Sequence, residues 1–135
     1  MGLEIKASER EGVAILALKG RIIAGEVSPV RDKISELLAA GQTRIVLDLG
    51  EVDYVDSTGL GTLVISFTQV QKAGGALKLA RLNRRNVELL ALTRLHTVFE
   101  VFADDTDAVN SFFPEREIKR FDILSFVQQR HDSEP

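Results

Sequence analysis

The residues of this chain best placed for chemistry are two adjacent hydroxyl residues, Ser57 and Thr58, which follow the carboxylate of Asp56. A serine hydroxyl can cap a helix, act as a nucleophile or accept a phosphoryl group. Catalysis by serine needs a base, and the chain has no Gly-x-Ser-x-Gly elbow around Ser57 and no histidines besides His96 and His131. We therefore expect no catalytic residue and no enzymatic activity.

Other reactive sites lack support as well. The chain has no cysteine, which excludes disulfides and thiolate sites, and two isolated histidines make no metal site. No phosphate-binding Gly-x-x-x-x-Gly-Lys sequence occurs. Asp48 could resemble the phosphoacceptor of a response-regulator receiver, but such a site needs an acidic pair after the first strand, where Lys19, Gly20 and Arg21 stand. We expect no metal and no cofactor.

Length and charge bound the class of protein. The 135 residues suit one domain with a real core, and 44% of them are apolar and 27% charged. A formal net charge of -3 without any basic run disfavours nucleic acid and anionic membranes as partners. The first six residues do not read as a signal peptide, and the longest apolar run, 13–18, is too short to span a bilayer. We expect a soluble cytoplasmic protein.

Short apolar runs alternate with segments of helical spacing along the chain. The expected strands are 3–7, 13–19, 44–49, 76–80 and 99–102, the first two joined by a turn at Glu11 and Gly12 and the third ended by Gly50. The expected helices are 29–40, with Ser28 as its N-cap, 56–73, 83–92 and one that opens between 104 and 106. This alternation predicts an α/β fold: an opening β-hairpin and a mostly parallel sheet of about five strands packed by crossover helices.

The start of helix 56–73 is unusual, because its first turn contains Gly59 and Gly61. Each costs about 0.5 to 1 kcal/mol relative to alanine, so helix stability does not explain them. Glycine is suited to the close approach of another backbone, from this fold or from a partner. Ser57, Gly61 and Ile65 recur every four residues and form a contact strip. The core strip is expected to hold Leu60, Leu63, Val64, Phe67 and Val70.

The segment Asp56-Ser57-Thr58-Gly59-Leu60-Gly61 after an apolar strand resembles the signature of the STAS family, and specifically of its anti-sigma-factor antagonists. Further similar places are 18–22, Gly74-Gly75, 89–93 and Val98-Phe99. Together these cover about residues 4 to 113. The resemblance implies a single STAS domain over residues 1–113.

The resemblance also implies a function and a site. In that family the domain binds an anti-sigma factor that is also a serine kinase, which frees a sigma factor, and phosphorylation after the motif's Asp ends the binding. The acceptor here would be Ser57, ahead of Thr58; ATP and Mg²⁺ would belong to the kinase, and a phosphoserine phosphatase would reverse the modification. The residues expected to contact the partner are Asp56, Ser57, Thr58, Gly59, Gly61 and Ile65.

Several readings stay open at the level of sequence. Ser57 can also be an ordinary helix cap, and Asp56 can be a capping acid or can orient the kinase or its metal. The alternative function is a STAS scaffold or adaptor subunit in a larger signalling or transport assembly, in which Ser57 is never modified. Whether the chain forms a homodimer is also open.

Residues 114–135 form an extension beyond the domain. Its apolar positions are Ile118, Phe121, Ile123, Leu124, Phe126 and Val127. We expect residues 117–129 to form a helix that covers an apolar patch of this domain or of a second copy. A helix dedicated to a partner is the alternative.

Overall fold

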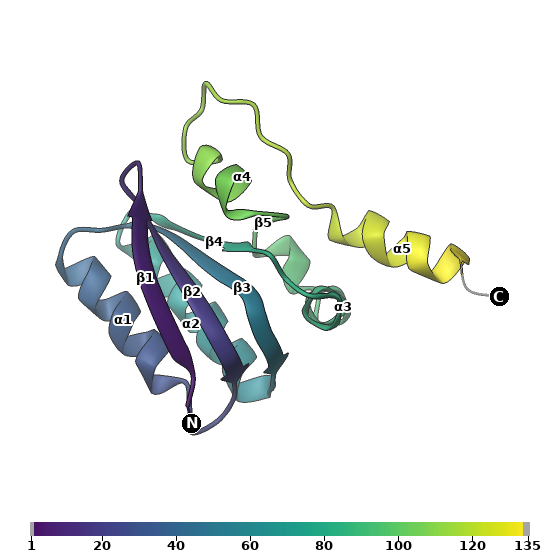
Figure 1. Ribbon diagram of the computed structural model, residues 1–135, viewed down its shortest axis with the longest axis horizontal. Helices are drawn as coiled ribbons and strands as arrows, with labels where there is room; N and C mark the ends of the chain where they lie inside the picture. The colour runs from purple at the N-terminus through teal and green to yellow at the C-terminus, as the bar shows by residue number, and fades with distance from the viewer. Residues whose placement is uncertain (1, 134–135) are drawn as a thin grey trace.

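In the computed structural model, which describes residues 2–133, the chain opens with the expected antiparallel hairpin (Figure 1). Strand β1 (Glu4–Arg10) pairs with β2 (Val13–Ile22), and Arg10 lies opposite Val13. Glu11 and Gly12 make the turn with backbone φ of 53° and 81°, the left-handed conformation that tight hairpin turns require.

The rest of the sheet is parallel, in the order β1-β2-β3-β4-β5. Its further strands are β3 (Arg44–Val55), β4 (Ala76–Ala80) and β5 (Val101–Phe102). The connections contain α1 (Ser28–Ala39), α2 (Ser57–Lys72), and α3 (Arg84–Leu92) with a short 3₁₀ turn, η1 (Leu95–Thr97). Helices α4 (Asp105–Asn110) and α5 (Ile123–Ser133) follow β5. The predicted α/β fold with an opening hairpin and a mostly parallel sheet is confirmed.

Apolar side chains cover both faces of the sheet, because the side chains of each strand alternate between them. On β2, Leu16 and Leu18 join a core with residues of α1, α2 and α3, whereas Val13 and Ile15 join a smaller core with Ala108 and Val109 of α4. Helices α1 and α2 lie together on one side of the sheet (Figure 1). Within residues 2–133, no helix has the length and apolarity needed to cross a membrane.

The start of α1 differs from the expectation, and its end agrees with it. Ser28 is the first helical residue rather than the N-cap, and the N-cap Val27 makes no side-chain capping bond. At the other end, Gly41 adopts φ 82° and the N–H of Gln42 donates to the carbonyl of Leu37 at 2.9 Å. This is the glycine-terminated helix end that the sequence predicted.

Strand β3 continues through Gly50, so the prediction that this glycine ends the strand is wrong. The glycine has a packing reason instead: a Cβ at position 50 would stand 2.7 Å from Cζ of Arg81. The guanidinium therefore occupies the place where a side chain would project. The longer strand runs to Val55, directly before α2.

The helix of the extension starts at Ile123, so the expectation of a helix from residue 117 is wrong for its first part. The N–H of Phe121 donates to the carbonyl of Val101 at 2.9 Å, which holds this segment against the edge strand β5. The Asp122 carboxylate then accepts the N–H of Ser125 at 3.1 Å, an N-cap arrangement that fixes where the helix begins.

The extension is attached to the domain at several points. Arg116 donates to both carboxylate oxygens of Glu11 at 2.8 and 2.9 Å. Ile118 packs against the core under α4, and Ile123 is buried in the core of the opposite face. The segment therefore crosses the β5 edge and contributes to both cores, while α5 continues past α3 away from the sheet (Figure 1).

We predict that Ile123→Ala lowers the free energy of unfolding by about 2 to 4 kcal/mol, because the side chain is only 5% exposed. The neighbouring Leu124, 50% exposed, is the matched control, and Leu124→Ala should change stability by less than about 0.5 kcal/mol. Urea denaturation followed by circular dichroism measures both. Equal small losses for the two variants would show that the extension is not anchored at Ile123.

Candidate functional site

Asp56 joins the amino end of α2 to the loop that follows β2. Its Oδ1 accepts the N–H of Gly59 at 2.7 Å, and its Oδ2 accepts the N–H of Ala24 at 3.0 Å. These backbone hydrogen bonds, that of Gly59 first, hold the pKa of the Asp56 carboxyl below its ordinary value. Asp56 is thus the N-cap of α2, which confirms its reading as a capping acid.

Ser57 is the first residue of α2 and is exposed, so the reading of Ser57 as the cap is wrong. Among the residues whose side chains the structure describes, 2–128, none forms a hydrogen bond with the Ser57 hydroxyl. The Thr58 side chain is exposed too, and the Thr58 carbonyl accepts the hydroxyl of Thr62 at 3.0 Å. The side chain of Ser57 is therefore accessible to solvent.

The two glycines of the motif have different surroundings. Gly59 is buried, and a Cβ there would overlap the backbone carbonyl of Ile22 at the end of β2. Gly59 thus serves the close approach of α2 to this fold and offers a partner little surface, although it was expected among the contact residues. Gly61 has nothing within 4 Å of an added Cβ, so no contact inside the domain requires it.

The predicted core strip of α2 lies in or against the core, and the buried face also includes residues that were not predicted. Leu63 and Val70 are buried as expected, but Leu60, Val64 and Phe67 are only partly buried. The other buried residues are Gly59, Thr62 and Ser66. These three residues are spaced three and four apart, which places them on one face of the helix. A search for apolar residues alone misses this face because two of the three are polar.

The remaining strip of α2 faces outward, as expected. Ser57 is exposed, Gly61 is open on its Cβ side, and Ile65 is 62% exposed. Beside this strip runs a shallow groove between α1 and α2, bridged by a hydrogen bond of 3.3 Å from Gln69 to Ser35. The groove is lined by Ser28, Arg31, Asp32, Ser35, Ile65 and Gln69.

The end of β3 is held in place by side chains at the start of α3. Strand β4 pairs only with residues 44–48 of β3, so the carbonyl of Val52 has no strand partner on that side. It accepts Nδ2 of Asn83 at 2.9 Å and Nδ2 of Asn86 at 3.1 Å instead. These contacts support the strand that leads to Asp56 and Ser57, and no local pattern of residues predicts them.

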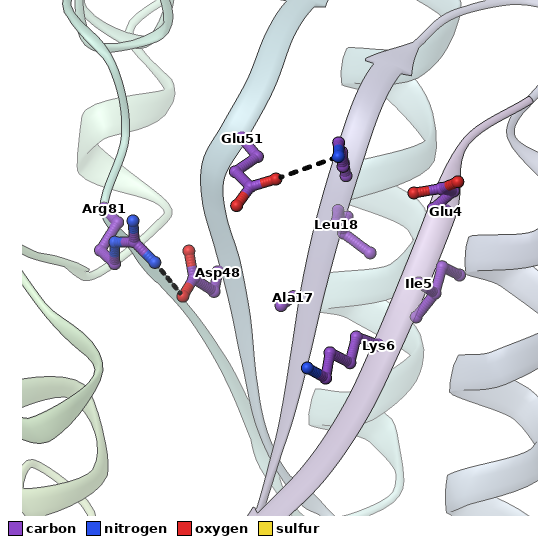
Figure 2. A pocket seen from close by; sticks show the side chains of 9 residues that line it. Glu4, Ile5, Lys6, Ala17, Leu18, Asp48, Glu51 and Arg81 are labelled. Carbon is purple, nitrogen blue, oxygen red and sulfur yellow. Dashed lines mark hydrogen bonds and ion pairs between the residues drawn. The ribbon is translucent and has the colours of Figure 1, made fainter.

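A second hollow lies on the opposite face of the sheet, toward its β1 side (Figure 2). Charged side chains of β1, β2 and β3 surround it, and the pairs Lys19–Glu51 at 3.9 Å and Arg81–Asp48 at 3.1 Å lie on its wall. It contains no residue of the predicted motif. Among the described residues, no group of His, Asp and Glu side chains is arranged to hold a metal ion.

The geometry defines an α/β domain that presents a free serine hydroxyl at a capped helix start. The STAS domain family matches residues 4–108, and the chain belongs to that family. The anti-sigma-B factor antagonist of Bacillus subtilis (strain 168) is 30% identical over 109 residues, which span 81% of this chain and 99% of that protein.

Solved structures share the fold. The crystal structure of an anti-sigma factor antagonist from Mycobacterium paratuberculosis matches with a TM-score of 0.73 at 20% identity, over 82% of this chain and 93% of that one. The Bacillus cell fate determinant SpoIIAA in the phosphorylated form matches with a TM-score of 0.64 at 17% identity, over 81% and 99%. The family match ends at residue 108, before the extension that starts at Pro114.

We predict opposite effects for alanine at the two glycines of the motif. Gly59→Ala should lower the free energy of unfolding by about 1 to 3 kcal/mol. The added methyl group would clash with the Ile22 backbone, which cannot rotate away as a side chain could. Gly61→Ala should raise it by about 0.5 to 1 kcal/mol through better helix propensity. Urea unfolding measures both, and equal changes in the two variants would refute the packing role of Gly59.

Proposed function

We propose that this chain is an anti-sigma factor antagonist, which binds an anti-sigma factor through the outward strip of α2 and which phosphorylation of Ser57 switches off. The observation that carries the proposal is the exposed Ser57 hydroxyl without an internal partner, at the start of a helix whose cap is supplied by Asp56 instead. The names of curated relatives support the proposal, since proteins that this chain matches over nearly their whole length are called anti-sigma factor antagonists.

The surface around Ser57 is suited to a protein partner. Ile65 exposes an apolar side chain, and Gly61 leaves room beside it for an atom of the partner to approach the helix backbone. Polar residues at the edge, such as Arg31 and Asp32 of α1, would give the contact its specificity. Asp56 would act indirectly, because both its oxygens already bind backbone N–H groups and fix the position of Ser57.

Phosphorylation would change this surface without unfolding the domain. The γ-phosphoryl group of ATP bound by the kinase with Mg²⁺ would form a bond to the Ser57 oxygen, releasing ADP and the hydroxyl proton. The product carries about -1.5 to -2 charges, which the unpaired N–H groups at the start of a 16-residue helix tolerate. A partner shaped for a neutral hydroxyl would have to desolvate that charge, and binding would be lost.

In this proposal the chain acts in the cytoplasm, where sigma factors meet RNA polymerase, and a phosphoserine phosphatase restores the binding form. The competing function is a STAS scaffold whose Ser57 is never modified. The two differ in one measurable property, which is whether the serine kinase that binds the chain also phosphorylates it.

We predict that incubation with ATP, Mg²⁺ and the cognate anti-sigma serine kinase adds one phosphoryl group to the wild-type chain and to Thr58→Ala, but none to Ser57→Ala. Intact-mass spectrometry reports the modification, and titration calorimetry reports the loss of kinase binding that should accompany it. Binding without any modification would favour the scaffold. Modification of Ser57→Ala and not of Thr58→Ala would move the acceptor to Thr58.

We predict that Ile65→Lys weakens binding to the anti-sigma factor by at least about tenfold, because a charge would replace an apolar contact at the centre of the surface. The control is Leu92→Lys, since Leu92 is 84% exposed on α3, away from the α1–α2 groove. Equal affinities of both variants and the wild type would place the interface elsewhere on the domain.

A further inference from the structure

Strand β1 forms the border of the sheet beside β2, and its outer side is open (Figure 1). All of its residues except Ile5 are exposed. The exposed residues include Ala7 and Glu9, which lie on the same face of the strand as Ile5, the face that packs against the core under α1 and α2. The two helices therefore leave this border accessible.

The hairpin determines which backbone groups of β1 point outward. The turn between β1 and β2 has two residues, so Arg10 and Val13 on either side of it form a hydrogen-bonded pair. Hydrogen-bonded and non-hydrogen-bonded pairs alternate along an antiparallel ladder. The N–H and C=O groups of Ile5, Ala7 and Glu9 therefore point away from β2. A further strand would pair with these groups.

A second copy of β1 fits this edge in one antiparallel register. When the strand pairs along its whole length with β1 of another copy, Ala7 faces Ala7 and Ile5 faces Glu9. Each of these pairs joins residues whose backbone groups point outward, so each pair can exchange both hydrogen bonds. A shift by one residue would place outward groups against groups already bonded to β2, which excludes such registers.

The charges of β1 select the same register. Across the pair, Glu4 of each copy faces Arg10 of the other. Lys6 faces the neutral Ser8. A shift by two residues in either direction loses this match, because Lys6 would then face Lys6 or Arg10. Opposite charges across an antiparallel pair are favourable and like charges are unfavourable. Charges on a border strand usually discourage pairing, whereas here they favour one partner in one register.

We propose that two copies of this chain associate through their β1 strands, about a two-fold axis at Ala7, and form one continuous sheet. Opposite residues of an antiparallel pair lie on the same face, so this axis is perpendicular to the sheet. Helices α1 and α2 of both copies then lie on one side, and the dimer presents two α2 surfaces, each with Ser57, in the same direction. This last consequence rests on the proposed function, but the association of the strands does not.

Sedimentation velocity of the full chain at low ionic strength, at concentrations up to about 1 mM, tests the association. The wild type should form a dimer that dissociates as salt is added, because the charge pairs are exposed and salt screens them. A monomer at every concentration would overturn the proposal. Neither result depends on whether the chain binds an anti-sigma factor.

Charge reversals test the register. Arg10→Glu brings carboxylates together and Glu4→Arg brings guanidinium groups together, so each should weaken the dimer by about tenfold. The double variant Glu4→Arg/Arg10→Glu restores opposite charges and should recover the wild-type affinity. Lys6→Glu is the matched control, because it makes the same change of charge as Arg10→Glu on the same face of β1 but faces Ser8, and it should not weaken the dimer.

Circular dichroism checks that each variant is folded. Undiminished association of both single variants, equal losses for Arg10→Glu and Lys6→Glu, or a double variant as weak as the single ones would overturn the register.

A cysteine at the centre of the strand tests the same arrangement without relying on charge. The chain has no cysteine, so Ala7→Cys carries a single thiol. In the dimer the two Cα atoms at this position would be about 5.5 Å apart, which a disulfide can bridge. Mild oxidation should cross-link Ala7→Cys at least about tenfold faster than Leu92→Cys, whose position on α3 is 84% exposed. Equal rates would contradict pairing at Ala7.

Discussion

The exposed surface of α2 depends on one carboxylate. Asp56 uses both oxygens for backbone N–H groups, one in α2 and one in the loop after β2, and this fixes the helix start against Ile22–Ala24. Because that carboxylate supplies the cap, the next residue has no capping role and its side chain is exposed. Within the motif, Asp56 and Gly59 fix the position of the start of α2, whereas Ser57 and Gly61 remain accessible.

The two faces of the sheet carry different elements of the fold. One face carries α1 and α2, with the groove and the serine proposed for partner binding. The other face carries α4 and the start of the extension. Strand β3 belongs to both, because Asp48 lies in its middle and Asp56 follows its end. A change on the α4 side therefore need not disturb the proposed binding surface.

The alternation of strands and helices was predictable because apolar periodicity is a local property of the chain. The errors arose where tertiary contacts override local signals. Gly50 looks like a strand end, yet it lies within β3, and the Arg81 guanidinium packs where its side chain would be. Ser28 looks like a cap, but the helix begins at it. The hydrogen bonds from Asn83 and Asn86 to the Val52 carbonyl join residues far apart in the chain and have no local signature.

The extension also determines how the sheet meets other molecules. At β5, the N–H of Phe121 donates a hydrogen bond to the Val101 carbonyl. Beside it, Arg120 forms an ion pair of 3.3 Å with Glu100. A strand from another chain would have to displace these contacts to lengthen the sheet there. On the opposite border, β1 offers its outer backbone groups between the exposed charges of Glu4, Lys6 and Arg10. Another strand could therefore add to the sheet only at the β1 edge, and the charged side chains there oppose aggregation through edge pairing.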